Sequence, residues 1–160
     1  EIDCTGLDPA SKQGDRRVND ALAAIRGGNA TISGRDIPDL IPALAVVAAG
    51  TPGTTRFKDI GRLRLKESDR IATTLALIEA LGGSGAAGPD SLEIYGKDRL
   101  PGGVCDSCGD HRIAMSAAIA SLRCTGPVML RGAQAVEKSY PAFWQAFASL
   151  GGQIAWEEEA

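Results

Sequence analysis

The sequence lacks the features that mark nucleic-acid and membrane proteins. It has no excess of positive charge, because 17 lysines and arginines stand against 20 aspartates and glutamates, for a formal net charge of −3. Proteins that bind nucleic acids or membrane surfaces usually carry a basic excess, so we expect neither partner. No apolar run approaches the length that spans a bilayer, and the first residues are polar, so no signal peptide is visible. Any anion-binding site must therefore be a local cluster of cations.

Cysteine is also scarce and irregularly spaced. Cys4, Cys105, Cys108 and Cys124 do not form the pattern of a secreted disulfide scaffold, so we expect a reducing, cytoplasmic environment. Cys105 and Cys108 form a CxxC pair followed by His111, but a structural zinc site usually needs a fourth ligand. Because the other cysteines lie far away in the sequence, we interpret this segment as a loop with two free thiols and expect no metal.

The rest of the sequence has the composition of an ordinary folded domain. A chain of 160 residues with 44% hydrophobic side chains can bury one core. It begins at Glu1 without a methionine, which suggests a piece of a longer polypeptide. Apolar periodicity, helix caps and glycine stops predict helices that alternate with strands, which is an α/β pattern. The expected helices are 16–26, 36–49, 68–81, 110–123 and 139–150; the expected strands are 30–33, 54–60, 91–95, 127–130 and a short one after 152; 101–109 is expected to be a glycine-rich loop.

This order of elements occurs twice. Asp39 and Asp110 each begin a predicted helix, and Lys66 and Lys138 each precede a predicted serine-capped helix. A repeat of about seventy residues is too long for a solenoid module and is typical of a duplicated α/β unit. The segments before Asp39 resemble the end of an earlier unit, so we expect a parent domain with three units.

The densest polar stretch is 62–70, with the sequence RLRLKESDR. Ser68 is a natural N-cap, and Asp69 suits the positive end of the helix dipole. Lys66 and Arg70 beside free N–H groups at a helix start form a ready anion-binding site. Taken alone, however, the stretch is better explained as a solvated connection in which opposite charges pair.

A second stretch strengthens the functional interpretation. The segment 109–112 again places an arginine in the first turn after an acidic cap, and Lys138 is a third cation at a helix entrance. If the units superpose, Asp39 and Glu67 lie among these cations. Cations hold anionic substrates and carboxylates move protons, so the pattern predicts group transfer between small phosphorylated or carboxylated molecules.

Each of these positions also has a purely structural explanation. Asp39 can cap its helix together with Asp36 around Pro38. His111, the only histidine, can serve as a capping or hydrogen-bonding residue. Lys138 can be an ordinary surface lysine that flanks a helix.

Four motifs, in order, resemble one family. They are 37–39 (IPD), 64–70 (RLKESDR), 110–115 (DHRIAM) and 138–141 (KSYP), and they resemble the 5-enolpyruvylshikimate-3-phosphate synthases (3-phosphoshikimate 1-carboxyvinyltransferases). The resemblance implies transfer of the enolpyruvyl group of phosphoenolpyruvate to the 5-hydroxyl of shikimate 3-phosphate, releasing phosphate, in aromatic amino-acid biosynthesis. It implies no metal or organic cofactor. It also implies an α/β fold of repeated βαβαββ-type units, in two similar domains that close on the substrates.

The resemblance covers nearly the whole chain but only roughly the last two-fifths of such an enzyme. It implies that 1–160 is a partial C-terminal domain of about two units, that 1–38 is the tail of an earlier unit, and that the N-terminal domain is absent. We therefore expect the fragment alone to be inactive.

The resemblance also implies a role for each polar residue of these motifs. Asp39 matches the proton acceptor near the shikimate hydroxyl, and Glu67 matches the proton donor to the phosphoenolpyruvate methylene. Arg62 stands where some relatives have an uncharged polar contact, so it receives no role. The binding residues implied are Asp39 and Lys66 for shikimate 3-phosphate, and Arg70, Arg112 and Lys138 for phosphoenolpyruvate and its competitor glyphosate.

Two other interpretations remain open. The UDP-N-acetylglucosamine enolpyruvyl transferases share the fold and reaction type, but they rely on a reactive loop cysteine and lack the 66–70 and 110–112 runs. A non-catalytic anion-binding module would keep the cations. Such a module gains nothing from acids in its site, so the presence of both Asp39 and Glu67 favours an enzyme.

Overall fold

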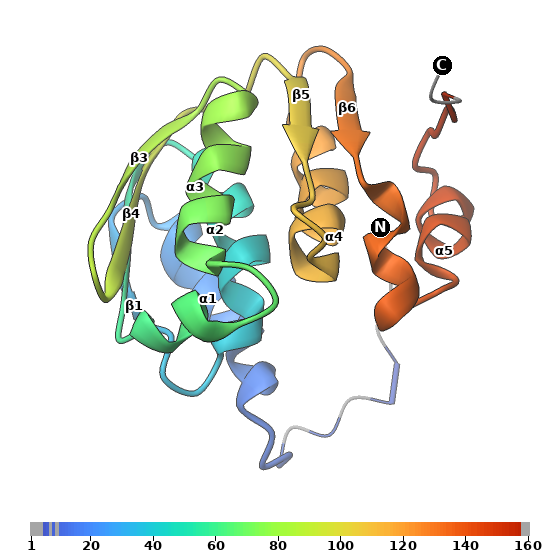
Figure 1. Cartoon of the computed structure of the whole chain (residues 1–160). Coiled ribbons are helices and arrows are strands. Elements are labelled where there is room, and N and C mark those ends of the chain that lie inside the picture. The colour runs from blue at the N-terminus through green and yellow to red at the C-terminus, as the bar shows by residue number, and fades with distance from the viewer. Residues whose placement is uncertain (1–4, 7, 9, 158–160) are drawn as a thin grey trace.

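The structure is a computed structural model that describes residues 5, 6, 8 and 10–157 (Figure 1). Cys4, Glu158 and Glu159 lie outside the described residues. None of the helices in the described part of the chain is long and apolar enough to cross a membrane.

Helices and strands alternate along most of the chain, as the sequence predicts. The strands are β1 Ala30–Ser33, β2 Gly53–Lys58, β3 Ser84–Ala87, β4 Ser91–Gly96, β5 Gly103–Asp106 and β6 Val128–Arg131. The α-helices are α1 Val18–Arg26, α2 Ile41–Ala49, α3 Arg70–Ala80, α4 His111–Ser121 and α5 Phe143–Ser149. Short 3-10 helices are η1 Gly14–Arg17, η2 Pro38–Leu40, η3 Gly61–Leu65 and η4 Ala133–Lys138.

The strands form two sheets. The first has four strands in the order β1-β2-β4-β3, in which β1 and β2 are parallel and β4 is antiparallel to both of its neighbours. The second is the parallel pair β5 and β6. In Figure 1 the four-stranded sheet covers one side of α2 and α3, and β5 and β6 lie on their other side.

Helix α2 forms the centre of the core. Its sequence, IPALAVVAA, is apolar on all sides, and seven of its residues are buried. A helix of this kind must be enclosed by other elements. Helix α2 contacts α4, β4, α3 and α1, and the main core cluster extends through all of them. A smaller cluster around Ala114 and Val136 joins α4 to η4 and α5.

The twofold repeat is visible in the fold. The order β1, α2, β2, α3 recurs as β5, α4, β6, α5, and in each case a helix connects two parallel strands. Parallel neighbours require such a crossover. The expected α/β class with repeated units is therefore confirmed, and the corresponding helices α2 and α4 begin with Asp39 and Asp110 close to their first turns.

The predicted start of α3 is wrong by one residue. Asp69, and not Ser68, is the N-cap, because Asp69 Oδ1 accepts hydrogen bonds from the backbone N–H groups of Ile71 and Ala72, both at 3.1 Å. The other oxygen of Asp69 pairs with Arg64 Nη1 at 2.5 Å. The hydroxyl of Ser68 is consequently free to bind elsewhere.

Several other boundaries also differ from the prediction, among them the start of α2, which lies at Ile41 after a 3-10 helix and not at residue 36. Strand β5 lies inside the expected glycine-rich loop, where Gly102 and Gly103 have positive φ and approach the backbone at Pro127 and Ala80 too closely for a side chain. Strand β3 is missed because its sequence, SGAA, contains no β-branched or aromatic residue. Helix α5 begins at Phe143, after a 3-10 helix. Residues 151–157, up to the end of the described part, form no strand.

Candidate functional site

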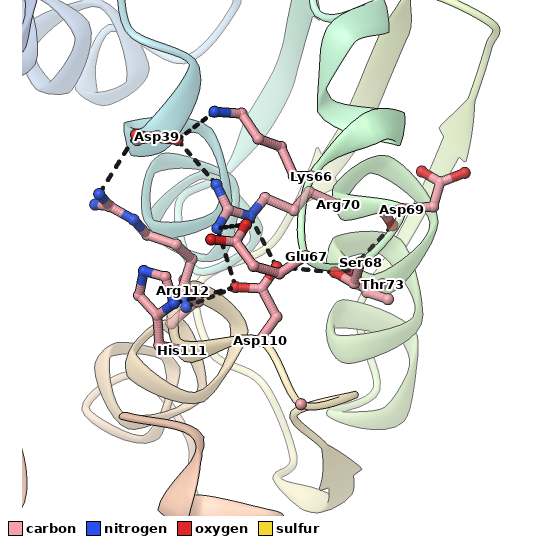
Figure 2. Close-up of polar contacts among 12 residues, drawn as sticks. Asp39, Lys66, Glu67, Ser68, Asp69, Arg70, Thr73, Asp110, His111 and Arg112 are labelled. Carbon is pink, nitrogen blue, oxygen red and sulfur yellow. Dashed lines mark hydrogen bonds and ion pairs between the residues drawn. The ribbon is translucent and has the colours of Figure 1, made fainter. Parts of the chain in front are cut away.

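The polar residues of the sequence motifs meet at one end of the helices. Figure 2 shows Asp39 from η2, Lys66 and Glu67 from the turn between η3 and α3, Arg70 from the first turn of α3, and Arg112 from the first turn of α4. Each local fold has a simple cause: Pro38 begins η2, and the extended backbone at Lys66 turns the chain out of η3. We call these five residues, together with Asp110, the helix-start cluster.

Arg70 lies at the centre of the helix-start cluster, and only 2% of its side chain is exposed. Its Nε donates to Asp110 Oδ2 at 2.8 Å, its Nη1 to Asp39 Oδ1 at 2.8 Å, and its Nη2 to Glu67 Oε2 at 2.6 Å and Asp110 Oδ1 at 3.2 Å. A guanidinium has five N–H groups, so one, on Nη1, remains available. Burial opposes the charge, but the hydrogen bonds and charges of the three carboxylates outweigh it and raise the pKa of Arg70.

Asp39 is the carboxylate with the most cationic surroundings. Besides Arg70, its partners are Lys66 Nζ at 3.5 Å and Arg112 Nη2 at 3.4 Å, and 34% of its side chain is exposed. Burial alone would raise the pKa of Asp39, but Arg112, Lys66 and Arg70 outweigh it and lower the pKa. Asp39 is therefore ionised at neutral pH and can accept a proton.

Glu67 is held by a single partner. Its only ion pair among the described residues is the one with Arg70, and 42% of its side chain is exposed. The cluster thus holds one carboxylate surrounded by cations and one that is open to solvent, both bound to the same guanidinium. Two carboxylates with different surroundings are suited to different roles in proton transfer.

Asp110 is fully buried behind Arg70. It is the N-cap of α4, because Oδ1 accepts the N–H of Arg112 at 2.9 Å, and Oδ2 also accepts the hydroxyl of Ser68 at 2.9 Å. Burial alone would raise its pKa, but the bonds from Arg70, Arg112 and Ser68 lower it. The sequence predicts only helix-capping roles for Asp110 and Ser68, because an acidic residue before His-Arg gives no sign that it contacts an arginine forty residues earlier in the chain.

The cluster has no excess of positive charge. Lys66, Arg70 and Arg112 face three carboxylates, so a multiply anionic ligand would need further cations. Arg112 Nε is buried and has no hydrogen-bond partner among the described residues. The guanidinium of Arg112 therefore retains donor capacity.

Three other polar residues of the motif segments are not part of the helix-start cluster. Lys138, at the end of η4, is exposed and donates to the carbonyl of Gly109 at 3.0 Å, one residue before Asp110. Arg62 turns away and donates to the carbonyl of Arg35. His111 Nδ1 is 4.0 Å from Asp110 Oδ1, too far for a hydrogen bond.

Among the described residues, the cysteines do not form a metal site with His111. Cys105 is buried in β5 and donates to the carbonyl of Met129, whereas Cys108 is exposed in the turn before α4. Among the residues that the structure describes, no group of three or more histidine, cysteine, aspartate or glutamate side chains could hold a metal ion. Burial and the charge of Asp106 raise the pKa of Cys105 to about 11.

Comparisons with known proteins identify the relatives of the chain. The sequence model of the family EPSP synthase (3-phosphoshikimate 1-carboxyvinyltransferase) matches residues 1–147. The 3-phosphoshikimate 1-carboxyvinyltransferase of Clostridium kluyveri is 40% identical over 96% of this chain and 40% of the relative, and that of Clostridium novyi is 42% identical over 92% and 38%. The chain thus spans about two fifths of the length of the curated relatives that it matches.

Solved structures have the same fold. An EPSP synthase structure from Acinetobacter baumannii matches with a TM-score of 0.65 and 35% identity over 70% of this chain and 26% of that one. The enolpyruvyl transferase NikO from Streptomyces tendae, at 21% identity, matches with a TM-score of 0.60 over 80% and 29%, which supports the fold alone. On the strength of the family match over nearly its whole length, the chain belongs to the EPSP synthase (3-phosphoshikimate 1-carboxyvinyltransferase) family.

Proposed function

We propose that the helix-start cluster is one side of a site that transfers the enolpyruvyl group of phosphoenolpyruvate to the 5-hydroxyl of shikimate 3-phosphate, with release of phosphate. The observation that carries this proposal is the pair Asp39 and Glu67, both bound to Arg70 and flanked by Lys66 and Arg112. The family membership supplies the reaction, and the cluster supplies acids and cations suited to it.

In this proposal the two carboxylates move the protons. Asp39, which is ionised, accepts the proton of the 5-hydroxyl as the oxygen bonds to C2 of phosphoenolpyruvate, while Glu67 protonates the C3 methylene. The resulting tetrahedral intermediate loses a C3 proton to the Glu67 carboxylate as the C2–O bond to the phosphate breaks. The phosphate leaves with the proton held by Asp39, which forms the enolpyruvyl ether and restores both acids. Arg70 binds Asp39 through Nη1 and Glu67 through Nη2 (Figure 2).

The cations bind the substrates in the same proposal. Lys66, with Asp39, contacts shikimate 3-phosphate, and Arg112 and Lys138 contact phosphoenolpyruvate together with the remaining N–H of Arg70. Because the cluster itself is charge-balanced, we propose that the other portion of a full-length enzyme, the N-terminal domain, supplies the additional cations and the closing half of the cleft. The 160 residues alone then give no turnover.

The two alternative functions fit less well. An enolpyruvyl transferase that depends on a reactive cysteine needs an activated thiolate, but burial raises the pKa of each described cysteine. A simple anion-binding module would gain nothing from placing Asp39 against its cations, because the carboxylate competes with the ligand.

The experiment that tests the proposal is a chimaera. The 160 residues replace the matching two fifths of the Clostridium kluyveri enzyme, and phosphate release is measured with both substrates and with each one omitted. We expect release only when both substrates are present, and none from the 160 residues alone. A folded chimaera that binds both substrates but releases no phosphate would refute the proposed activity.

A further inference from the structure

Asp110 is a charged residue that the proposed reaction does not use. Its side chain is fully buried, and it accepts hydrogen bonds from Arg70, Ser68 and the backbone of Arg112. A helix cap needs only the last of these bonds. The same structure contains a residue for comparison: Asp69 caps α3 through the same kind of bonds, but its side chain pairs with Arg64 and accepts no hydrogen bond from the Arg70 guanidinium.

The two oxygens of Asp110 bind one edge of the Arg70 guanidinium. Oδ2 receives Nε at 2.8 Å and Oδ1 receives Nη2 at 3.2 Å, which is a bidentate arrangement. Because a guanidinium is planar and rigid, fixing one edge fixes the direction of every other N–H. Nη1 then points to Asp39 at 2.8 Å, and the second N–H of Nη2 points to Glu67 at 2.6 Å.

Ser68 holds the orientation of Asp110 in turn. Its Oγ donates to Asp110 Oδ2 at 2.9 Å and lies 3.1 Å from the hydroxyl of Thr73 on α3. Since Asp110 begins α4 and Ser68 precedes α3, these bonds tie the start of a helix in one repeat unit to the start of a helix in the other. Figure 2 shows this chain of contacts passing from Thr73 and Ser68 through Asp110 to Arg70.

We propose that Asp110, supported by Ser68, is a positioning residue of the reaction: it fixes the Arg70 guanidinium so that Nη1 and Nη2 hold Asp39 and Glu67 in place. The inference rests on the proposed function, because Asp39 and Glu67 are its proton-transfer groups. Asp110 itself is enclosed behind Arg70 and touches no substrate. Its removal misaligns the two acids without removing either of them.

The discriminating variant is Asp110→Asn. Asparagine caps helices as well as aspartate, and its carbonyl oxygen can still accept the N–H of Arg112. Its amide group then faces Arg70 Nε, so that a donor opposes a donor. The matched control is Asp69→Asn, which makes the same change of charge at the cap of α3 and leaves the contacts of Arg70 in place.

The first measurement uses the 160-residue chain and needs no activity. In ¹⁵N NMR, the Nε–H of Arg70, assigned by its loss in Arg70→Lys, gives a resolved signal in the wild-type chain because it is buried and hydrogen-bonded. We expect this signal to shift and broaden in Asp110→Asn and to remain unchanged in Asp69→Asn.

The second measurement uses the chimaera with the Clostridium kluyveri enzyme. Misplacement of catalytic groups by about 1 Å costs about 100-fold, so we expect kcat to fall about 100-fold in Asp110→Asn. The KM for shikimate 3-phosphate should change much less than kcat, because Lys66, which is proposed to bind that substrate together with Asp39, does not contact Asp110. Ser68→Ala removes one of the bonds to Asp110 and should lower kcat less, in the same direction.

The outcomes separate the inference from the function on which it rests. Wild-type kcat together with an unchanged Arg70 signal in Asp110→Asn would show that Asp110 is only a cap. A wild-type chimaera without turnover would refute the proposed function, while the Arg70 signal would still decide whether Asp110 orients the guanidinium. If Asp110→Asn does not fold, as judged by circular dichroism, Ser68→Ala decides, and wild-type kcat and Arg70 signal in that variant overturn the inference.

Discussion

The burial of Arg70 and Asp110 leads to a strong prediction about stability. Both side chains are enclosed, at 2% and 0% exposure, and their Nε to Oδ2 distance is 2.8 Å. Removing one partner of a buried pair leaves the other charge without compensation and costs about 3–5 kcal/mol. We expect this loss in Arg70→Ala, which leaves Asp110 unpaired. Because whole domains are stable by only about 5–15 kcal/mol, this variant should be close to unfolding.

The assay is urea unfolding of the 160-residue chain, followed by far-ultraviolet circular dichroism at pH 7. The variants are Arg70→Ala, Asp110→Ala and the double variant. Since each single change leaves one buried charge and the double change leaves neither, the double variant should lose less stability than the two single variants added together. Equal and additive losses of less than about 1 kcal/mol, the range of exposed pairs, would refute this reasoning.

The stability that the buried pair of Arg70 and Asp110 contributes should depend on pH. The pKa of Asp110 is lowered in the folded chain, because the bonds from Arg70, Arg112 and Ser68 outweigh burial. Its contribution to stability is therefore present above the ordinary aspartate pKa of about 3.9 and is lost as the pH falls through the lower folded value. The difference in the free energy of unfolding between wild type and Asp110→Asn should be largest at pH 7 and should become smaller as the pH falls through the folded pKa of Asp110.

Three further predictions concern catalysis and metal. In the chimaera, Arg112→Ala should lower kcat/KM for phosphoenolpyruvate about 100-fold or more, because the negative charge of the substrate is left unpaired in the cleft. Steady-state kinetics measures this change directly. Asp39→Ala should lower kcat far more than the affinity for phosphoenolpyruvate, since a proton acceptor acts in the transition state; wild-type kcat would make Asp39 a structural residue only. After mild chelation, elemental analysis of the chain should find well under one zinc per molecule. A stoichiometric zinc that resists chelation and is needed for folding would contradict the interpretation that Cys105, Cys108 and His111 are not metal ligands.

The sequence predicts the membership of the helix-start cluster well. Asp39, Lys66, Glu67, Arg70 and Arg112 all lie at helix starts or in the turns before them, and repeated α/β units bring such starts to one end of the helices. Lys138 was expected to belong with them but lies at the adjacent turn of Gly109. Helix α5, which follows Lys138, begins four residues later than predicted, so the side chain does not project from a helix start.

The sequence does not predict how these residues are connected. Whether Arg70 is exposed or buried depends on how closely α3 approaches α4, which is a property of core packing and not of either motif. The same approach turns Asp110 from an ordinary cap into a partner of Arg70 and draws the hydroxyl of Ser68 away from the N-cap position. Local propensity therefore finds the positions, and tertiary contacts determine their roles.

The central claim is that Asp39 and Glu67 move protons during enolpyruvyl transfer. It is tested most directly by running the chimaera reaction in D2O and measuring deuterium in the enolpyruvyl methylene of the product by mass spectrometry. If Glu67 protonates C3 and a C3 proton is then lost, the wild-type product carries deuterium there. Glu67→Gln, which preserves the size of the side chain, should then abolish both transfer and deuterium incorporation while both substrates still bind. Product formation at the wild-type rate by Glu67→Gln, with deuterium in the methylene, would contradict the claim.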